Sequence, residues 1–302
     1  MVGTITPMAV TADEPKRRRS VRSRLSTVSF STATYVGLIA LSALVILPLG
    51  WMFTVALTPD NANVFTNPPM WFPSEYWHWE NFARALLDER RPFLLYLANT
   101  VFLEVFVVFG SLVSCALVAY PLARMKFKGR DVVFTIIVLT MLIPWQALMI
   151  PQFAVFYELG WYGTYLPLII PAYTGSAFFV FLIRQYMRTI PKELDEAARL
   201  DGAGHFRIFL SVILPLSKPA LAVCAVFTFL GTWNDLLGPV IYLNEQDQFT
   251  AAVGLAGFVS VQNQEYNLLM AANLITIVPV VILYFVAQKY LIGGIASMGM
   301  KG

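Results

Sequence analysis

Long stretches without a charged side chain set the hydrophobic pattern of this chain. Five stretches contain no Asp, Glu, Lys or Arg, and they cover residues 25–59, 105–123, 132–157, 159–183 and 266–288. Two broader stretches, 92–123 and 219–244, each contain a single acid, Glu104 and Asp235. A helix needs about 20 apolar residues to cross the hydrocarbon core of a bilayer. The pattern therefore predicts six crossings, near residues 33–57, 94–120, 132–156, 164–186, 218–240 and 267–290.

The composition supports the same assignment. Hydrophobic residues make up 58% of the chain and charged residues 13%, against about 45–50% and about 25% in an ordinary soluble domain. The predicted helices also lack the alternation of apolar and polar faces that buried helices of soluble proteins show. Cys115 and Cys224 both fall in predicted membrane segments and imply no disulfide framework. His78 and His205 lie in different loops, so no metal site is expected.

Basic residues indicate how the chain sits in the membrane. If the N-terminus is cytoplasmic, only Arg84, Arg90 and Arg91 of the 21 Lys and Arg residues lie on the outer side. This bias follows the positive-inside rule, so both termini are expected in the cytoplasm. Residues 1–31 then form a cytoplasmic basic tail that can bind lipid headgroups, and residues 32–302 form the transmembrane domain. A twin-arginine export signal is the alternative for the tail, but the hydrophobic run that follows is too long for a signal-peptide core.

The largest cytoplasmic connection, residues 187–217, contains the densely charged stretch KELDEAARLD. Pro191 suits the first turn of a helix, and Gly202 suits the residue just after its end. A second helix, HFRIFLSVIL, then leads through Pro215 into the fifth predicted crossing. The connection therefore predicts a helix-turn-helix that lies parallel to the membrane.

The surface of its first helix is unusual for a membrane protein. Asp195 and Arg199 are expected to form an i, i+4 ion pair, and Glu196 is expected to be exposed. A shallow face of small or apolar residues is formed by Leu194, Ala197 and Ala198. Two interpretations fit: an amphipathic connector that lies on lipid headgroups, or a docking surface for a cytoplasmic partner. Helices that bind membrane surfaces are usually basic and aromatic, so the docking surface explains more of the features.

This stretch resembles a signature of one transporter class. Glu196-Ala197-Ala198, three residues, Gly202, nine residues and then Val212-Ile213-Leu214-Pro215 resemble the EAA motif of importer-type ABC permeases, with Val212 in place of Ile. The resemblance extends to FLIRQYMRTIPKELDEAARLDGAG, to Trp233-Asn234-Asp235 and to the ending QKYLIGGIASMGMKG, where Met298 departs from a common Gly. Together with the outer-loop prolines Pro68, Pro69 and Pro73, these segments are similar to carbohydrate-uptake permeases related to the smaller membrane subunit of the maltose transporter.

The resemblance implies an all-α membrane protein with six transmembrane helices and a cytoplasmic EAA coupling helix-turn-helix between helices 4 and 5. It implies a permease subunit of a binding-protein-dependent ABC importer for a sugar or related polyol in a bacterial or archaeal plasma membrane. The implied partners are a second, different permease that supplies the other half of the pore, two ATPase subunits and an extracytoplasmic sugar-binding protein. The residues implied in ATPase coupling are Glu196, Ala197, Ala198, Asp201, Gly202, Leu214 and Pro215, and the tail with Lys301 is also expected to contact the ATPases.

The chain lacks the motifs of an ATPase or of a common hydrolase. It contains no GxxxxGK[ST], no HExxH and no GxSxG, so this chain is expected to bind no cofactor, while ATP and Mg²⁺ belong to the partner ATPase. No nucleic-acid partner is expected. A secondary, ion-coupled transporter is one alternative, but it gives the charged loop no role. An intramembrane enzyme is another, and Glu104 and Asp235 would be its only candidate dyad. Isolated acids that face a pore or a partner subunit explain them more simply.

Interrupted helices suggest where a substrate would pass. Prolines recur in the predicted helices 3 to 6, and broken helices with polar groups line cavities in transporters. The candidate pore-lining residues are Gln146, Tyr173, Trp233, Asn234, Asp235 and Asn273. Aromatic rings among them could stack on a sugar or could simply pack in the protein, and both readings stay open. A stripe of small residues on helix 2, Ser111, Cys115 and Ala119, is expected to mediate helix packing.

Overall fold

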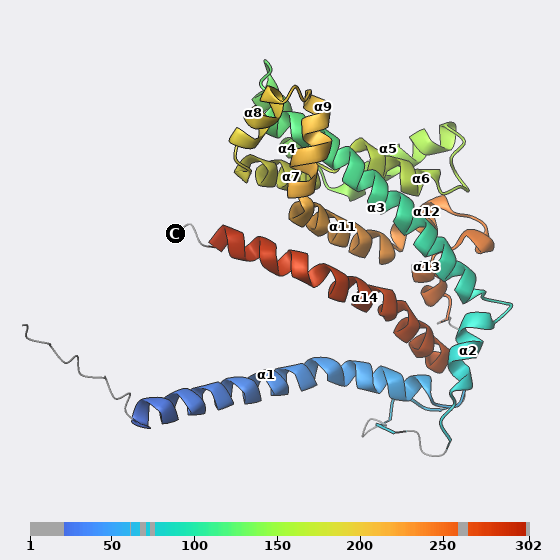
Figure 1. Ribbon diagram of the computed structural model, residues 1–302. Coiled ribbons are helices and arrows are strands. Elements are labelled where there is room, and N and C mark those ends of the chain that lie inside the picture. Colours follow the sequence, from blue (N-terminus) through green and yellow to red (C-terminus); the bar gives the residue numbers. More distant parts are fainter. Residues whose placement is uncertain (1–20, 61, 67–70, 73–75, 259–264, 300–302) are drawn as a thin grey trace, which may run out of the picture. The chain divides into compact units, whose positions relative to one another are not determined.

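The computed structural model describes residues 21–60, 62–66, 71–72, 76–258 and 265–299, and every regular element in those ranges is a helix (Figure 1). This agrees with the predicted all-α fold class. The chain divides into two units, residues 1–51 and 52–302. The first contains most of α1 (Val21–Ala56), whose side chains from 32 to 50 are exposed. All contacts described below lie within the second unit. The outer-loop prolines, the basic stretch 16–19 and Lys301 lie outside the described residues.

The second unit is built around one long helix, α3 (Phe93–Arg124). The elements before and beside it are α2 (Glu80–Leu87), α4 (Arg130–Thr140), α5 (Trp145–Glu158), α6 (Leu166–Ile169), η1 (Ile170–Thr174) and α7 (Ala177–Thr189). The remainder are α8 (Glu193–Leu200), α9 (His205–Ile208), η2 (Phe209–Ile213), α10 (Leu214–Leu216), α11 (Lys218–Trp233), α12 (Leu237–Tyr242), η3 (Gln246–Gln248), α13 (Ala251–Ala256) and α14 (Tyr266–Gly299). In Figure 1, α3 runs beside α7 and α11.

Four segments are long and apolar enough to cross a membrane: Thr32–Ala56, Phe93–Arg124, Leu166–Thr189 and Tyr266–Tyr290. Two further pairs of helices meet the same test only as bent units. Arg130–Thr140 and Trp145–Glu158 meet at 95°, and His205–Leu216 and Lys218–Trp233 meet at 74°. If each bent pair counts as one span, the number reaches six. These segments support a multi-pass membrane protein, and the count of six stays a prediction.

Several predicted boundaries were wrong, and prolines account for most of the differences. The predicted third crossing is interrupted before Pro144, whose backbone is extended (φ −67°, ψ 136°), because proline disfavours helical geometry in the residue before it. The second predicted helix was expected to end at Pro121 but continues to Arg124, because the amide of Met125 donates to the Pro121 carbonyl at 3.1 Å. The first helix begins at Val21, so the last part of the predicted tail is helical.

Small side chains on α3 let α7 and α11 approach it closely. Cys115 and Ala119 are fully buried in a core cluster with residues of α7, η2 and α11. The Ser111 hydroxyl lies 3.8 Å from the Cys224 sulfur on α11 and accepts a hydrogen bond from Thr228 at 3.3 Å. Small residues with hydroxyl groups are typical of close helix contacts in membranes. The predicted packing role of the stripe on helix 2 is confirmed.

Gly110 lets another element approach α3 closely. A Cβ added at Gly110 would lie 2.4 Å from the ring of Tyr173 in η1. No real Cβ makes such a contact, so the ring of Tyr173 occupies the space that any other residue would need at Gly110. This contact fixes η1 against the middle of α3.

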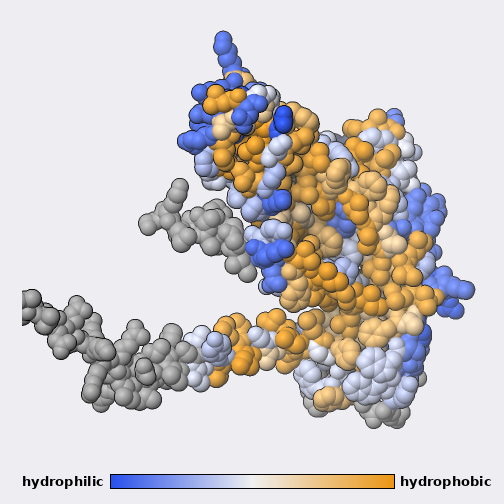
Figure 2. All heavy atoms as spheres, in the orientation of Figure 1, coloured by the Kyte–Doolittle hydropathy of each residue, from blue (hydrophilic) through white to orange (hydrophobic). Residues whose placement is uncertain are grey.

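Apolar side chains face outward over much of the second unit. Figure 2 shows hydrophobic residues along the faces of α3 and α11, whereas hydrophilic residues gather at the end that carries α8 and along the right-hand edge of the view. Large hydrophobic residues such as Phe102, Val105 and Phe109 on α3 are 45%, 61% and 59% exposed. Apolar exposure on this scale marks contact with lipid or with a partner subunit rather than with water.

Candidate coupling site

The charged helix α8 starts and ends on strong local signals. Pro191 precedes it, and three acids occupy its first turn, where the partial positive charge of the helix dipole favours them. At its end, Gly202 has φ +80°. The amide of Gly202 donates to Arg199 O and the amide of Ala203 donates to Ala198 O, both at 2.9 Å. This pair of bonds is a Schellman cap, so the predicted stop at Gly202 is confirmed.

The partner of Asp195 differs from the prediction. Asp195 does not pair with Arg199, four residues on, but with Arg124 at the end of α3. Arg124 Nη2 lies 2.8 Å from Asp195 Oδ1, and Arg124 Nε lies 2.9 Å from Oδ2. The side chains of Arg124 and Asp195 are only 2% and 8% exposed. A buried arginine fork is the better partner because exposed i, i+4 pairs gain only about 0.3–0.5 kcal/mol.

Arg124 uses every donor that its guanidinium has. Besides the two bonds to Asp195, Nη1 donates to Met187 O at 3.1 Å and to Ile190 O at 2.7 Å, and Nη2 donates to Pro191 O at 3.0 Å. A guanidinium carries five N–H groups, and all of them are therefore satisfied. One side chain of α3 thus joins the last carbonyls of α7, the loop before α8 and α8 itself.

A second arginine makes the reciprocal contact. Arg184 of α7 is buried and donates from Nε to Leu122 O, near the end of α3, at 3.1 Å. Its guanidinium lies 3.6 Å from the centre of the Phe134 ring on α4, and Nη2 lies 3.7 Å from Asp131. Cations near helix C-termini are favourable because the last carbonyls carry partial negative charge. A carbonyl near the end of α3 therefore accepts a hydrogen bond from Arg184 of α7, and a carbonyl near the end of α7 accepts one from Arg124 of α3.

The outer surface of α8 presents both an acid and apolar groups. Glu196 and Ala197 are exposed, as is Asp201, while Ala198 packs against the core cluster. Leu200 is 89% exposed and Phe206 is 68% exposed, and neither was among the predicted site residues. The spacing of Leu200 from Glu196 and Ala197, four and three residues, is the signal that would have placed it on the same face.

The second helix of the loop contains a π-helical turn. The turn η2 (Phe209–Ile213) follows α9, and such turns are rare and frequent at functional sites. Tyr120 of α3 donates to His205 O at 3.0 Å, which ties α9 to the same long helix. Leu214 is half-buried against the core cluster and Pro215 is exposed. Ser217, whose hydroxyl donates to Ile213 O at 2.7 Å, lies at the bend into α11.

The candidate pore residues differ in their surroundings. Trp233 is 3% exposed, stacks on Phe229 at 5.1 Å and donates to Thr276 O at 3.2 Å, which favours the packing reading for this residue. Asn273 is half-buried and donates to Leu269 O at 3.0 Å within α14. The exposed candidates are Gln146, Tyr173 and Asn234. Their pore-lining role stays a prediction.

The two intramembrane acids do not form a dyad. Glu104 is 4% exposed, and within the described residues neither of its carboxyl oxygens has a hydrogen-bond partner. Asp235 was expected inside the fifth helix but lies in the break after α11, where its Oδ1 accepts a hydrogen bond from the Gly238 amide at 3.1 Å. Asp235 therefore acts as a local cap for the start of α12.

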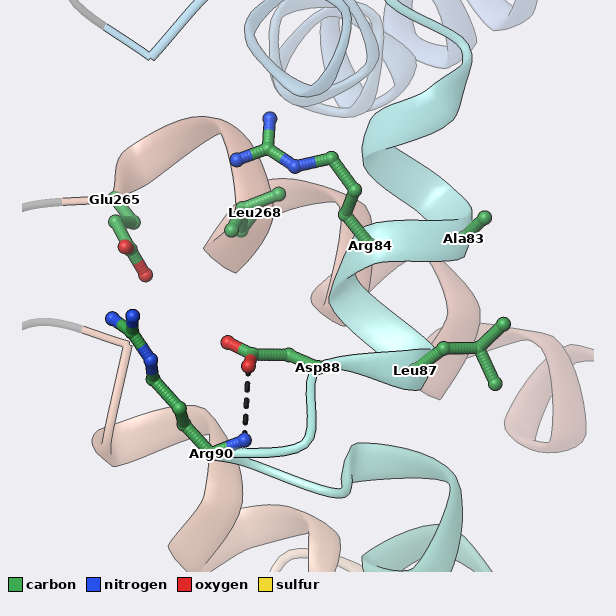
Figure 3. Close-up of a pocket in the computed structure, with 7 residues that line it drawn as sticks. All are labelled: Ala83, Arg84, Leu87, Asp88, Arg90, Glu265 and Leu268. Atoms are coloured by element: carbon green, nitrogen blue, oxygen red, sulfur yellow. Dashed lines mark hydrogen bonds between the residues drawn. The ribbon is translucent and has the colours of Figure 1, made fainter.

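A pocket of about 540 Å³ lies at the opposite end of α3 (Figure 3). Its lining residues are Ala83, Arg84, Leu87, Asp88, Arg90, Glu265 and Leu268. Figure 3 shows Asp88 turned toward the Arg90 amide, which donates to Asp88 Oδ1 at 3.0 Å. Arg91 pairs with both Asp88 and Glu265 and lies 4.6 Å from the centre of the Phe258 ring. These ion pairs tie the start of α3 to α14.

Apolar spans, interrupted helices and a capped charged helix fixed to the end of the central span indicate a membrane permease. The match to known families agrees. The chain belongs to the family of binding-protein-dependent transport system inner membrane components, whose family model matches residues 107–296. It is thus a transport component of an ABC importer rather than an enzyme.

Curated relatives are similar along most of the chain. The arabinooligosaccharides transport system permease protein AraQ of Halalkalibacterium halodurans is 36% identical over 217 residues, which are 72% of this chain and 77% of that protein. The diacetylchitobiose uptake system permease protein NgcG of Streptomyces coelicolor is 31% identical over 272 residues, 89% of this chain and 88% of that protein. The sn-glycerol-3-phosphate transport system permease protein UgpE of Yersinia pestis is 32% identical over 260 residues, 84% of this chain and 92% of that protein.

Solved structures share the fold. A chain from a bacterial ABC transporter involved in the import of the acidic polysaccharide alginate matches with a TM-score of 0.75 and 27% identity, covering 90% of this chain and 98% of that one. A chain from a bacterial alginate ABC transporter in complex with an alginate pentasaccharide-bound periplasmic protein matches with a TM-score of 0.60 and 16% identity, covering 89% and 94%. The second likeness concerns the fold alone.

Proposed function

We propose that this chain is one of two different permease subunits of an ABC importer for a sugar or a related polyol, and that it forms half of the translocation pore. The names of its relatives support this substrate class, since they are permeases for arabinooligosaccharides, diacetylchitobiose and glycerol phosphate. An extracytoplasmic sugar-binding protein delivers the substrate. The description of its family as binding-protein-dependent supports such a partner.

The rest of the proposed assembly is supported by the family to which the chain belongs and by the distribution of its charges. Two cytoplasmic ATPase subunits bind and hydrolyse ATP with Mg²⁺, because this chain has no phosphate-binding loop. Both termini lie in the cytoplasm of a bacterial or archaeal cell, in keeping with the positive-inside rule. Gln146, Tyr173 and Asn234 line the pore, together with Asp235 and Asn273. Exposure of the first three in the single chain supports this role.

The observation that carries the proposal is the split of α8 into a fixed inner face and a free outer face. Asp195 and Ala198 hold the helix against α3 and the core cluster, whereas Glu196 and Ala197 are exposed. We infer that the outer face, with the Asp201–Gly202 turn behind it and Leu214 and Pro215 at the start of the return helix, docks on the ATPase. Glu196 then meets a basic group there.

Glu196→Ala tests this docking. The variant should insert and fold normally because Glu196 is exposed, yet it should release the ATPase in detergent, since an unpaired buried cation at an interface costs about 2–5 kcal/mol. Glu89→Ala is the matched control, an exposed acid at the opposite end of α3. ATPase retained on the affinity-purified complex is the measurement.

The same comparison separates the alternatives. A connector that lies on lipid headgroups predicts normal ATPase retention for Glu196→Ala. A secondary transporter predicts uptake that follows an ion gradient and ignores this loop. Equal ATPase retention in Glu196→Ala and Glu89→Ala would defeat the proposal.

A further inference from the structure

The side chain of Arg124 links the proposed coupling helix, α8, to the central helix α3 through its ion pair with Asp195. Helix α8 has only eight residues, and an isolated helix of that length is not stable in water. It therefore depends on contacts with the rest of the chain. Its inner side meets the rest of the chain through Asp195, which is buried against Arg124, and through Ala198. The ion pair is the directional part of this contact, because a bidentate arginine–carboxylate pair fixes both distance and angle.

Arg124 also lies where α3 and α7 end and α8 begins. It is the last residue of α3, and its other donors bind the carbonyl of Met187 in the last turn of α7 and those of Ile190 and Pro191 in the loop that follows. α3 in turn packs along α7 and α11. A displacement of α8 therefore has a direct route to the central helix through the Arg124 guanidinium.

We propose that Arg124 is the positioning residue that makes the end of α3 and the coupling helix move as one body, so that a displacement of α8 by the ATPase is delivered to the core of the pore. This rests on the proposed docking of α8 to an ATPase. Arg124 acts through Asp195 and touches neither nucleotide nor substrate. Its role is to transmit a displacement, beyond the stability that any buried ion pair gives.

The test uses the whole complex with the second permease, the ATPase subunits and the cognate binding protein. Arg124→Lys keeps the charge but loses the fork, and Asp195→Asn keeps the shape but loses the charge. Arg184→Lys is the matched control: it is the same substitution at the same end of the bundle, and the described contacts of Arg184 are with Leu122, Asp131 and Phe134, none of which belongs to α8.

Three quantities are measured: ATPase retention, stimulation of ATP hydrolysis by the binding protein, and amide hydrogen exchange of residues 193–203. Losing charge-assisted bonds should speed exchange in α8 by about tenfold or more. Arg124→Lys and Asp195→Asn should both keep the ATPase bound, because Glu196 is intact, and both should lose most of the stimulation. The double variant should be no worse than the worse single variant. Arg184→Lys should keep its stimulation and its α8 exchange even if its melting temperature falls.

Other outcomes overturn the inference. Unchanged stimulation and unchanged α8 exchange in Asp195→Asn would sink it, and so would losses of stimulation in Arg124→Lys and Asp195→Asn that add in the double variant. Equal losses in Arg184→Lys would make the effect a general loss of stability. Failure of the docking proposal is a separate result, because it would appear as normal ATPase retention in Glu196→Ala.

Discussion

At the scale of single residues, Gly202 sets the direction in which the chain leaves α8. Its φ of +80° is a conformation that L side chains rarely adopt, and a Cβ added there would meet no atom within 4 Å. A substitution therefore costs backbone strain alone, about 1–2 kcal/mol for an ordinary residue, less for Asn and more for a β-branched residue. We expect binding-protein-stimulated ATP hydrolysis to fall in the order Gly202→Asn, Gly202→Ala, Gly202→Val. A Val variant as active as the Asn variant would show that the turn does not matter.

The ion-pair partner of Asp195 could not be predicted from the local sequence. The i, i+4 spacing to Arg199 indicated one partner, but the carboxylate binds Arg124, which lies 71 positions earlier. No spacing within the loop reveals that choice, because it depends on where α3 ends. By contrast, the exposure of Glu196 and the cap at Gly202 were predictable, because both follow from residues within one or two turns.

At the scale of elements, the contact between α3 and η1 gives a sharp test of packing. Gly110→Ala would place a methyl group against the Tyr173 ring, and overpacking of this kind costs about 1–3 kcal/mol. Adding Tyr173→Ala should relieve part of that cost, so the loss in the double variant should be less than the sum of the two single losses. Melting temperatures of the purified chain measure the effect.

Gly231→Ala is the control for this substitution, since Gly231 lies in the last turn of α11 and a Cβ there would meet no atom within 4 Å. It should leave the melting temperature unchanged or raise it slightly, because Gly is a poor helix former. Equal losses for Gly110→Ala and Gly231→Ala would argue against the close contact.

The carboxylate of Asp60 joins α2 and α14 to the segment after α1. Arg84 donates to it at 2.9 and 3.0 Å and Asn267 at 2.8 Å. These bonds, those of Arg84 first, lower the pKa of Asp60 below its ordinary value of 3.8. The ionised form is therefore favoured by folding, and its contribution is full above the ordinary value and is lost as the pH falls through the lowered one.

Asp60→Asn should accordingly lower the melting temperature near neutral pH, and its difference from the unmodified chain should shrink once the pH falls below 3.8. The effect is at most about 1 kcal/mol, because Arg84 and Asp60 are both about half exposed. Melting curves across the acidic range measure it. A difference that stays constant with pH would assign the loss to the amide's shape rather than to the charge.

Hydropathy predicted the apolar segments well but not their breaks. A hydrophobic run reports that its residues favour lipid, and both halves of a bent span do so equally. The interruption at Pro144 and the end of α11 at Trp233 depend on backbone geometry, and Trp233 and Asp235 take their local partners from that geometry. This is why the surroundings of Trp233 and Asp235 were harder to predict from sequence than the cap of α8.

At the scale of the whole molecule, the topology can be tested with two exposed acids. Glu89 precedes α3 and Glu193 opens α8. An impermeant thiol reagent added to intact cells should label Glu89→Cys and leave Glu193→Cys unlabelled until the membrane is opened. The native Cys115 and Cys224 are buried, so they should give little background. Labelling of Glu193→Cys alone in intact cells would reverse the topology.

The buried position of Arg124 has a consequence for how the protein is made. While the ribosome is still synthesising α3, the partner Asp195 lies 71 residues further along and does not yet exist. In the proposed topology, Arg124 is at that stage an unpaired charge that helps the insertion machinery retain this end of the helix in the cytosol. Only after α7 and α8 have been synthesised can the same guanidinium bind Asp195 and the carbonyl of Met187. Lysine keeps the positive charge needed during insertion but cannot form the bidentate contact with Asp195, whereas alanine can do neither. Arg124→Ala would therefore impair both insertion and coupling, and Arg124→Lys tests coupling alone.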